Sequence, residues 1–112
     1  MAKVARWLDA VEVEGDSMLP ALEPGDRLLV ESISFGRRAP RIGEIVLAAD
    51  PREPERELVK RVVAIEPNGD LVVRGDAGER STDSREFGPL PVSAVRWRVL
   101  VRYAPMGRFG CP

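Results

Sequence analysis

The segment ELVKRVVAIEPNGDLVVR, residues 57–74, decides the fold class of this chain. Its apolar positions are mostly β-branched, which favours strands over helices. Asn68-Gly69 interrupts the run with a dipeptide that strongly favours a hairpin turn. The segment therefore predicts two antiparallel strands, at 57–66 and 70–74, joined by a tight turn at Asn68-Gly69.

Similar patterns flank this hairpin on both sides. Further strands are predicted at 11–14, 27–33, 44–48 and 95–103. Helical candidates are short, at 2–9 and 17–22. The remaining long stretches are predicted loops, at 36–43, 50–57 and 75–89. We therefore expect a mainly β fold, a small single-domain β-barrel or a pair of packed sheets.

Composition narrows the function classes. The chain has 112 residues, of which 44% are hydrophobic and 31% charged, as in one soluble globular domain. The net charge of −1 does not favour nucleic acid as a partner. Cys111 is the single cysteine and histidine is absent, which excludes a disulfide framework and a zinc site. We expect no metal and no cofactor, and no role is predicted for Cys111.

The sequence predicts no membrane-spanning segment. No run approaches the roughly 18 apolar residues that a spanning helix needs. The start, MAKVARWLDAVEV, lacks the apolar core of a signal peptide. Residues 1–112 are expected to form one catalytic domain, with 1–10 as an extension without an anchor and 11–103 as the core. The expected location is the cytoplasm, with peripheral or former attachment to a membrane as the alternative.

The segment EGDSMLP places Ser17 directly after a predicted strand and a Gly-Asp turn signal. A serine at the start of a helical turn lies beside free backbone N–H groups, which can stabilise an oxyanion near its hydroxyl. Gly15 would let a substrate carbonyl approach the backbone closely. The alternative is that Ser17 only caps a turn. Since the chain has no histidine, an activated serine needs another base.

Lys60 is the candidate for that base. A strand period of two places it on one face with Leu58, Val62 and Ala64. A buried lysine loses its charge more readily and can accept a serine proton. The alternative is an edge lysine that extends its ammonium to water. The residues alone leave both interpretations open.

Together with GDAGERSTDSREFG (75–88), these segments resemble the type I signal peptidase family, the Ser-Lys leader peptidases. EGDSMLPALEPGDRLLV (14–30) resembles the nucleophile box, and LVKRVVAI (58–65) resembles the general-base box. The resemblance implies a fold of the signal peptidase type with Ser17 as nucleophile and Lys60 as general base. It also implies that Ser81 orients the lysine.

Other positions carry structural roles by the same resemblance. Gly15, Ser17 and Met18 would form the nucleophile turn and its oxyanion site. The structural residues of the last box would be Gly75, Asp76, Asp83, Ser84 and Arg85, with an ion pair between Asp83 and Arg85. The sequence departs from the family pattern where Ala77 replaces an asparagine, and where some members have serine in place of Gly15.

The resemblance implies a serine endopeptidase that removes an N-terminal leader from a precursor protein, which would be its partner. Small soluble members of this kind resemble the maturation proteases of nickel-type superoxide dismutase. Two other interpretations compete. Self-cleaving repressors related to LexA share the dyad and a GDSM-like box, but carry a DNA-binding domain upstream. A non-catalytic β-domain that binds a partner would use the same motifs as turns.

Overall fold

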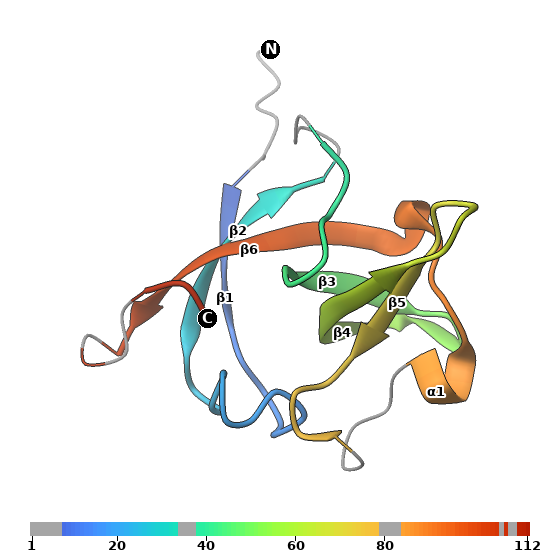
Figure 1. Ribbon diagram of the computed structural model, residues 1–112. Coiled ribbons are helices and arrows are strands. Elements are labelled where there is room, and N and C mark those ends of the chain that lie inside the picture. The colour runs from blue at the N-terminus through green and yellow to red at the C-terminus, as the bar shows by residue number, and fades with distance from the viewer. Residues whose placement is uncertain (1–7, 34–37, 79–83, 106, 108–109) are drawn as a thin grey trace.

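A computed structural model describes residues 8–33, 38–78, 84–105, 107 and 110–112. One antiparallel sheet dominates these residues (Figure 1). The elements are β1 (Leu8–Glu12), β2 (Arg27–Ser32), β3 (Ile45–Asp50), β4 (Glu53–Ile65), β5 (Leu71–Arg74), α1 (Ser84–Phe87), the 3-10 turn η2 (Val92–Ala94) and β6 (Val95–Ala104). The predicted mainly β fold is confirmed.

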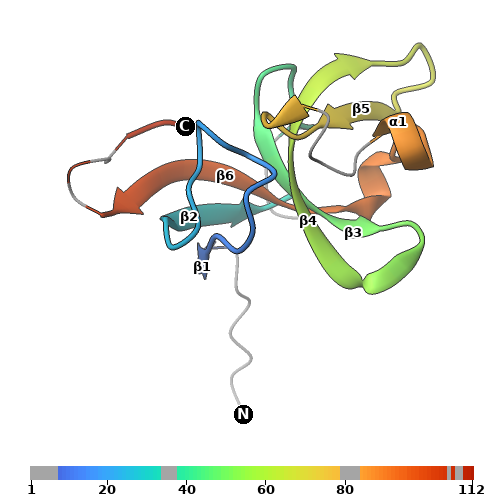
Figure 2. The ribbon, with the colours of Figure 1, turned by 90° about the horizontal axis from the view of Figure 1, so that it is seen from below.

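The strand order in the sheet is β1-β2-β6-β3-β4-β5, so β1 and β5 are its outer strands. β6 joins the two halves, because it pairs with β2 through residues 97–104 and with β3 through residues 95–98. The sheet curls strongly about β6, which crosses the molecule in both views (Figures 1 and 2). The fold is therefore one curled open sheet.

β3 lies between two hydrophobic clusters. Its alternate residues Ile45 and Leu47 belong to the first cluster, and Val46 and Ala48 belong to the second. Burial on both faces explains why this strand has a continuous apolar sequence where a half-exposed strand would alternate. The other buried members of the first cluster are Val13, Met18, Leu22, Leu28 and Val30, and those of the second are Val62, Leu71, Val73, Leu90 and Val95.

The predicted hairpin at 57–74 forms, with β4 and β5 paired antiparallel. Its turn has three residues, 67–69, between Glu66 and Asp70. The Gly69 N–H donates to the Glu66 carbonyl at 2.8 Å, and Gly69 has a φ of 93°. A glycine in the left-handed region after a tight turn is typical of three-residue hairpin loops.

The prediction of a loop at residues 50–57 was wrong. Residues 50–57 are not a loop, since β3 extends to Asp50 and β4 begins at Glu53. The Asp50 carboxylate accepts the Arg52 N–H at 2.9 Å and so closes a short turn between them. Of the predicted helix 2–9, residues 8 and 9 belong to β1, and residues 2–7 lie outside the described part.

Two further segments contain short turns. Residues 17–22 form a turn in which the Leu22 N–H donates to the Met18 carbonyl at 2.9 Å, without a helix proper. The predicted loop 75–89 contains α1, which has four residues. In the described ranges, no helix has the length and apolar character needed to cross a bilayer.

Candidate active site

The chain reverses direction between β1 and Ser17. Gly15 has a φ of 75°, a conformation that glycine adopts without a Cβ penalty. The Leu19 N–H donates to the Asp16 carbonyl at 3.1 Å, which closes a tight turn around Ser17. Met18 is 2% exposed and packs in the first hydrophobic cluster. This buried neighbour anchors the turn and holds Ser17 half-buried at the surface.

The backbone of Ser17 contacts the last sequence box. Its carbonyl accepts the Ala77 N–H at 2.9 Å. Neither its own N–H nor its hydroxyl has a hydrogen-bond partner among residues 8–33, 38–78 and 84–105. Within those ranges, the Ser17 N–H is therefore available to an oxyanion and its hydroxyl to a base.

Lys60 is 2% exposed. It lies in β4 opposite Val46, and its same-face neighbours Leu58 and Val62 are also buried. The alternative of an edge lysine that reaches solvent is therefore wrong. Desolvation disfavours the charged form of an ammonium, so this position favours a lysine that can act as a base.

The pairing of β4 with β5 brings the last box beside Lys60. Arg61 pairs with Arg74, the last residue of β5, and Gly75 follows Arg74 directly as Lys60 precedes Arg61. Gly75 is buried. Because Ala77 binds Ser17 just two positions later in the chain, residues 75–77 connect the strand of Lys60 with the turn of Ser17.

An ion pair fixes residue 76 of this connection. The Arg61 Nε and Nη2 atoms donate to Asp76 Oδ1 and Oδ2 at 2.9 and 2.8 Å. Arg61 Nη1 also donates to the Gly43 carbonyl at 2.8 Å. The hydrogen bonds with Asp76 raise the pKa of the Arg61 guanidinium, so its charge is secured. Sequence reasoning missed Arg61, although a cation next to Lys60 and an acid after Gly75 were the available signal.

The rest of the last box is only partly described. Arg85 Nη2 donates to the Gly78 carbonyl at 2.6 Å, which ties α1 to the segment after β5. Ser84 is the first residue of α1. Ser81 and Asp83 lie outside the described residues, so the orienting role of Ser81 and the Asp83–Arg85 ion pair stay predictions.

Arg52 holds α1 against the turn between β3 and β4. Its Nη1 donates to Glu86 Oε2 at 3.3 Å, and its Nε donates to Asp50 Oδ1 at 3.3 Å. Its guanidinium carbon lies 5.7 Å from the centre of the Phe87 ring. This cation thus links two elements whose contact was not predictable from the sequence.

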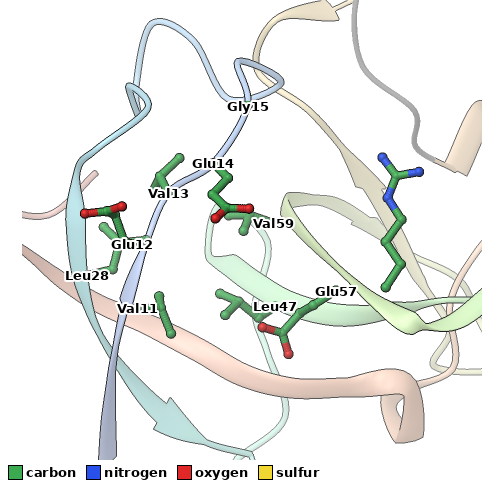
Figure 3. Close-up of a pocket in the computed structure, with 10 residues that line it drawn as sticks. Val11, Glu12, Val13, Glu14, Gly15, Leu28, Leu47, Glu57 and Val59 are labelled. Atoms are coloured by element: carbon green, nitrogen blue, oxygen red, sulfur yellow. The ribbon is translucent and has the colours of Figure 1, made fainter.

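A groove of about 510 Å³ begins at Gly15, two positions before Ser17 (Figure 3). It lies between β1, an outer strand of the sheet, and the β3–β4 pair. Its apolar lining residues are Val11, Val13, Leu28, Leu47 and Val59. Its charged lining residues are Glu12, Glu14, Arg56 and Glu57. An extended peptide in this groove would pass the Ser17 turn.

Comparisons with known proteins give one consistent family. Residues 2–68 match the family described as signal peptidase, peptidase S26. Mitochondrial ATP-independent inner membrane protease subunit 1b of Arabidopsis thaliana is 36% identical, with 86% of this chain and 70% of that protein covered.

Two further relatives agree with this match. Mitochondrial inner membrane protease subunit 1 of Homo sapiens is 29% identical, with 89% of this chain and 72% of that protein covered. Probable signal peptidase I-1 of Synechocystis sp. is 27% identical, with 88% of this chain and 72% of that protein covered. The similarity thus extends well beyond the three short boxes.

Proposed function

Because the chain belongs to the signal peptidase family, peptidase S26, we propose that it removes an N-terminal leader from a precursor protein through a Ser17–Lys60 dyad. The observation that carries this proposal is the position of residues 75–77. Arg61, next to Lys60, pairs with Arg74, next to Gly75, and the Ala77 N–H donates to the Ser17 carbonyl. Burial of Lys60 gives the dyad its base.

The reaction is acyl transfer in two steps. Neutral Lys60 accepts the Ser17 hydroxyl proton while Ser17 Oγ attacks the scissile carbonyl carbon. The Ser17 N–H donates to the oxyanion of the tetrahedral intermediate. When the C–N bond breaks, the leaving amine takes the proton from Lys60. A water molecule, deprotonated by Lys60, then hydrolyses the ester and releases Ser17.

The substrate is an extended peptide that adds to the outer edge of β1. Backbone hydrogen bonds along the strand give affinity, and the groove takes alternate side chains. Small residues at the cleavage site are expected from the family resemblance. A leader-bearing superoxide dismutase of the nickel type is one candidate precursor. The proposed location is the cytoplasm, with peripheral attachment to a membrane as the alternative.

The family match favours leader removal over the self-cleavage of LexA-like repressors. Those repressors share only the dyad and the serine box with the signal peptidase family. A non-catalytic β-domain is the remaining alternative. It would tolerate the loss of the Ser17 hydroxyl without any functional change.

The test is cleavage mapping by mass spectrometry. Wild type and Ser17→Ala are incubated with a panel of precursor proteins, including leader-bearing superoxide dismutase, and circular dichroism checks both folds. We expect cuts after small residues that only wild type makes. A folded wild type that makes no Ser17-dependent cut from acid to alkaline pH would contradict the proposal and favour a binding domain.

A further inference from the structure

The groove next to the Ser17 turn has an excess of negative charge. Three carboxylates and one guanidinium line it: those of Glu12, Glu14, Glu57 and Arg56. Glu12 already has a cationic neighbour, since its Oε1 lies 3.8 Å from Arg27 Nε. In the described part of the chain, the side-chain carboxylates of Glu14 and Glu57 have no hydrogen-bond or ion-pair partner. Two carboxylates therefore remain to meet a ligand.

The one cation of the groove does not remove this excess. Arg56 acts on Asp50, whose pKa is lowered first by the hydrogen bond from Arg52 and also by the charge of Arg56. The charge of Arg56 thus also acts on Asp50, which does not line the groove. The groove keeps a negative charge beside Glu14 and Glu57.

These two carboxylates flank the path of an extended peptide. Figure 3 shows the side chains of Glu14 and Glu57 in the space between β1 and the β3–β4 pair, with Leu47 and Val59 behind them. Both glutamates are exposed. A lysine or arginine suits this arrangement, because its aliphatic stem can lie on the apolar floor while its charged end reaches the carboxylates.

We propose that the groove selects peptides with a lysine or arginine near the scissile bond, with the cation between Glu14 and Glu57. This inference rests on the proposed function, which places the scissile bond at Ser17. Glu14 precedes Ser17 by three positions, and the chain turns between them, so Glu14 lies near the scissile bond. An extended substrate chain rises about 3.3 Å per residue. The basic residue therefore lies roughly two to five positions from the scissile bond.

The test uses peptides that share one cleavable site. Lysine, glutamine or glutamate is placed in turn at each position of that window, and kcat/KM is measured for wild type. At one position we expect lysine to exceed glutamine by about two- to fivefold, as for an exposed ion pair, and glutamate to be the poorest. The preference should fall as salt rises.

Variants assign the preference to the two carboxylates. Glu14→Gln and Glu57→Gln should each reduce it, and Glu57→Lys should reverse it in favour of glutamate. Glu55→Gln is the matched control, since Glu55 is an exposed residue of the same strand that does not line the groove. It should keep the wild-type preference.

Binding of the same peptides to Ser17→Ala, measured by fluorescence anisotropy, separates the two proposals. Cleavage of all three peptide series with equal kcat/KM would overturn the basic preference and leave the protease intact. A preference that survives Glu14→Gln and Glu57→Gln would overturn it too. Lysine-dependent binding without cleavage would support the groove's selectivity and contradict the proposed reaction. If the protein neither binds nor cleaves any of these peptides, both proposals are overturned.

Discussion

At the scale of single residues, Asp76 holds the connection between the Ser17 turn and Lys60. Its hydrogen bonds with Arg61 are charge-assisted and bidentate, and the paired side chains are only 24% and 21% exposed. Asp76→Asn keeps the size of the side chain and removes its charge. We expect a loss of about 1–2 kcal/mol in the free energy of unfolding and slower cleavage.

Urea denaturation and kcat/KM measure both effects. The matched control is Glu66→Gln, which removes an exposed carboxylate from the turn of the same hairpin. An Asp76→Asn protein that behaves like this control would show that the Arg61 pair does not hold the site together.

The candidate residues differ in how far the sequence could predict them. Ser17 follows a turn signal, so its local geometry was predictable from EGDSMLP. The burial of Lys60 was not, because it depends on pairing with Val46, which belongs to another segment. Arg61 was missed for the same physical reason. Its partner Asp76 is brought near only by the β4–β5 register.

At the scale of elements, Glu44 fastens the segment before β3. Arg38 Nη1 and Nη2 donate to its two oxygens at 2.7 and 2.8 Å, and the Arg41 N–H donates to Oε1 at 2.6 Å. The Arg98 Nε atom of β6 lies 3.8 Å from Glu44 Oε2. The Arg38 hydrogen bonds, then the Arg41 N–H and the two guanidinium charges, lower the pKa of Glu44 despite its partial burial.

The lowered pKa of Glu44 determines how the stability of the protein changes with pH. A glutamate whose pKa is lowered in the folded state stabilises the protein at pH values above its ordinary pKa, about 4.3. That stability is lost as the pH falls through the folded-state pKa. Glu44→Gln should therefore unfold more easily at neutral pH and lose less stability on acidification than wild type does. The pKa of Asp50 is also lowered, so the variant should keep part of the dependence of the free energy of unfolding on pH.

Urea denaturation at neutral and acid pH measures this difference. Glu12→Gln is the control, because its ion pair with Arg27 is more than half exposed and contributes little. Wild-type acid sensitivity in Glu44→Gln would show that Glu44 does not contribute to it.

Most strands were predictable because alternation and β-branched residues mark them locally. The region 50–57 was not, because its exposed charged residues and prolines have the composition of a loop. There the carboxylate of Asp50 closes the turn and pairing with β3 makes the strand, which local propensity does not record.

At the scale of the whole molecule, two hydrophobic clusters on either side of β3 hold the curled sheet. Leu22 is fully buried in the first cluster, four positions after Met18 of the Ser17 turn. Leu22→Ala should lower the free energy of unfolding by about 2–5 kcal/mol, through lost burial and the cavity left behind.

Thermal and urea denaturation check this value against Ile42→Ala. Ile42 is 62% exposed, so its truncation should change stability by less than about 0.5 kcal/mol. Equal effects of the two substitutions would contradict the assignment of the first cluster as a core.

The groove is the feature that only the whole fold could provide. Glu14 and Glu57 are far apart in sequence and lie in different segments, and the curl of the sheet places both on one groove. Neither the hydrophobic pattern nor the signal peptidase resemblance points to them. The sequence could therefore predict the fold class and the candidate dyad, but not the shape and charge that would select a substrate.

The central claim is that Lys60 is the base for Ser17, and Lys60→Met tests it most directly. Methionine suits the buried face and cannot accept a proton. The measurement is kcat/KM for leader cleavage from acid to alkaline pH, with the fold checked by circular dichroism. We predict that wild type gains activity as the pH rises and Lys60 loses its proton, and that folded Lys60→Met shows no turnover at any pH. A folded Lys60→Met protein that cleaves at close to the wild-type rate would contradict the account.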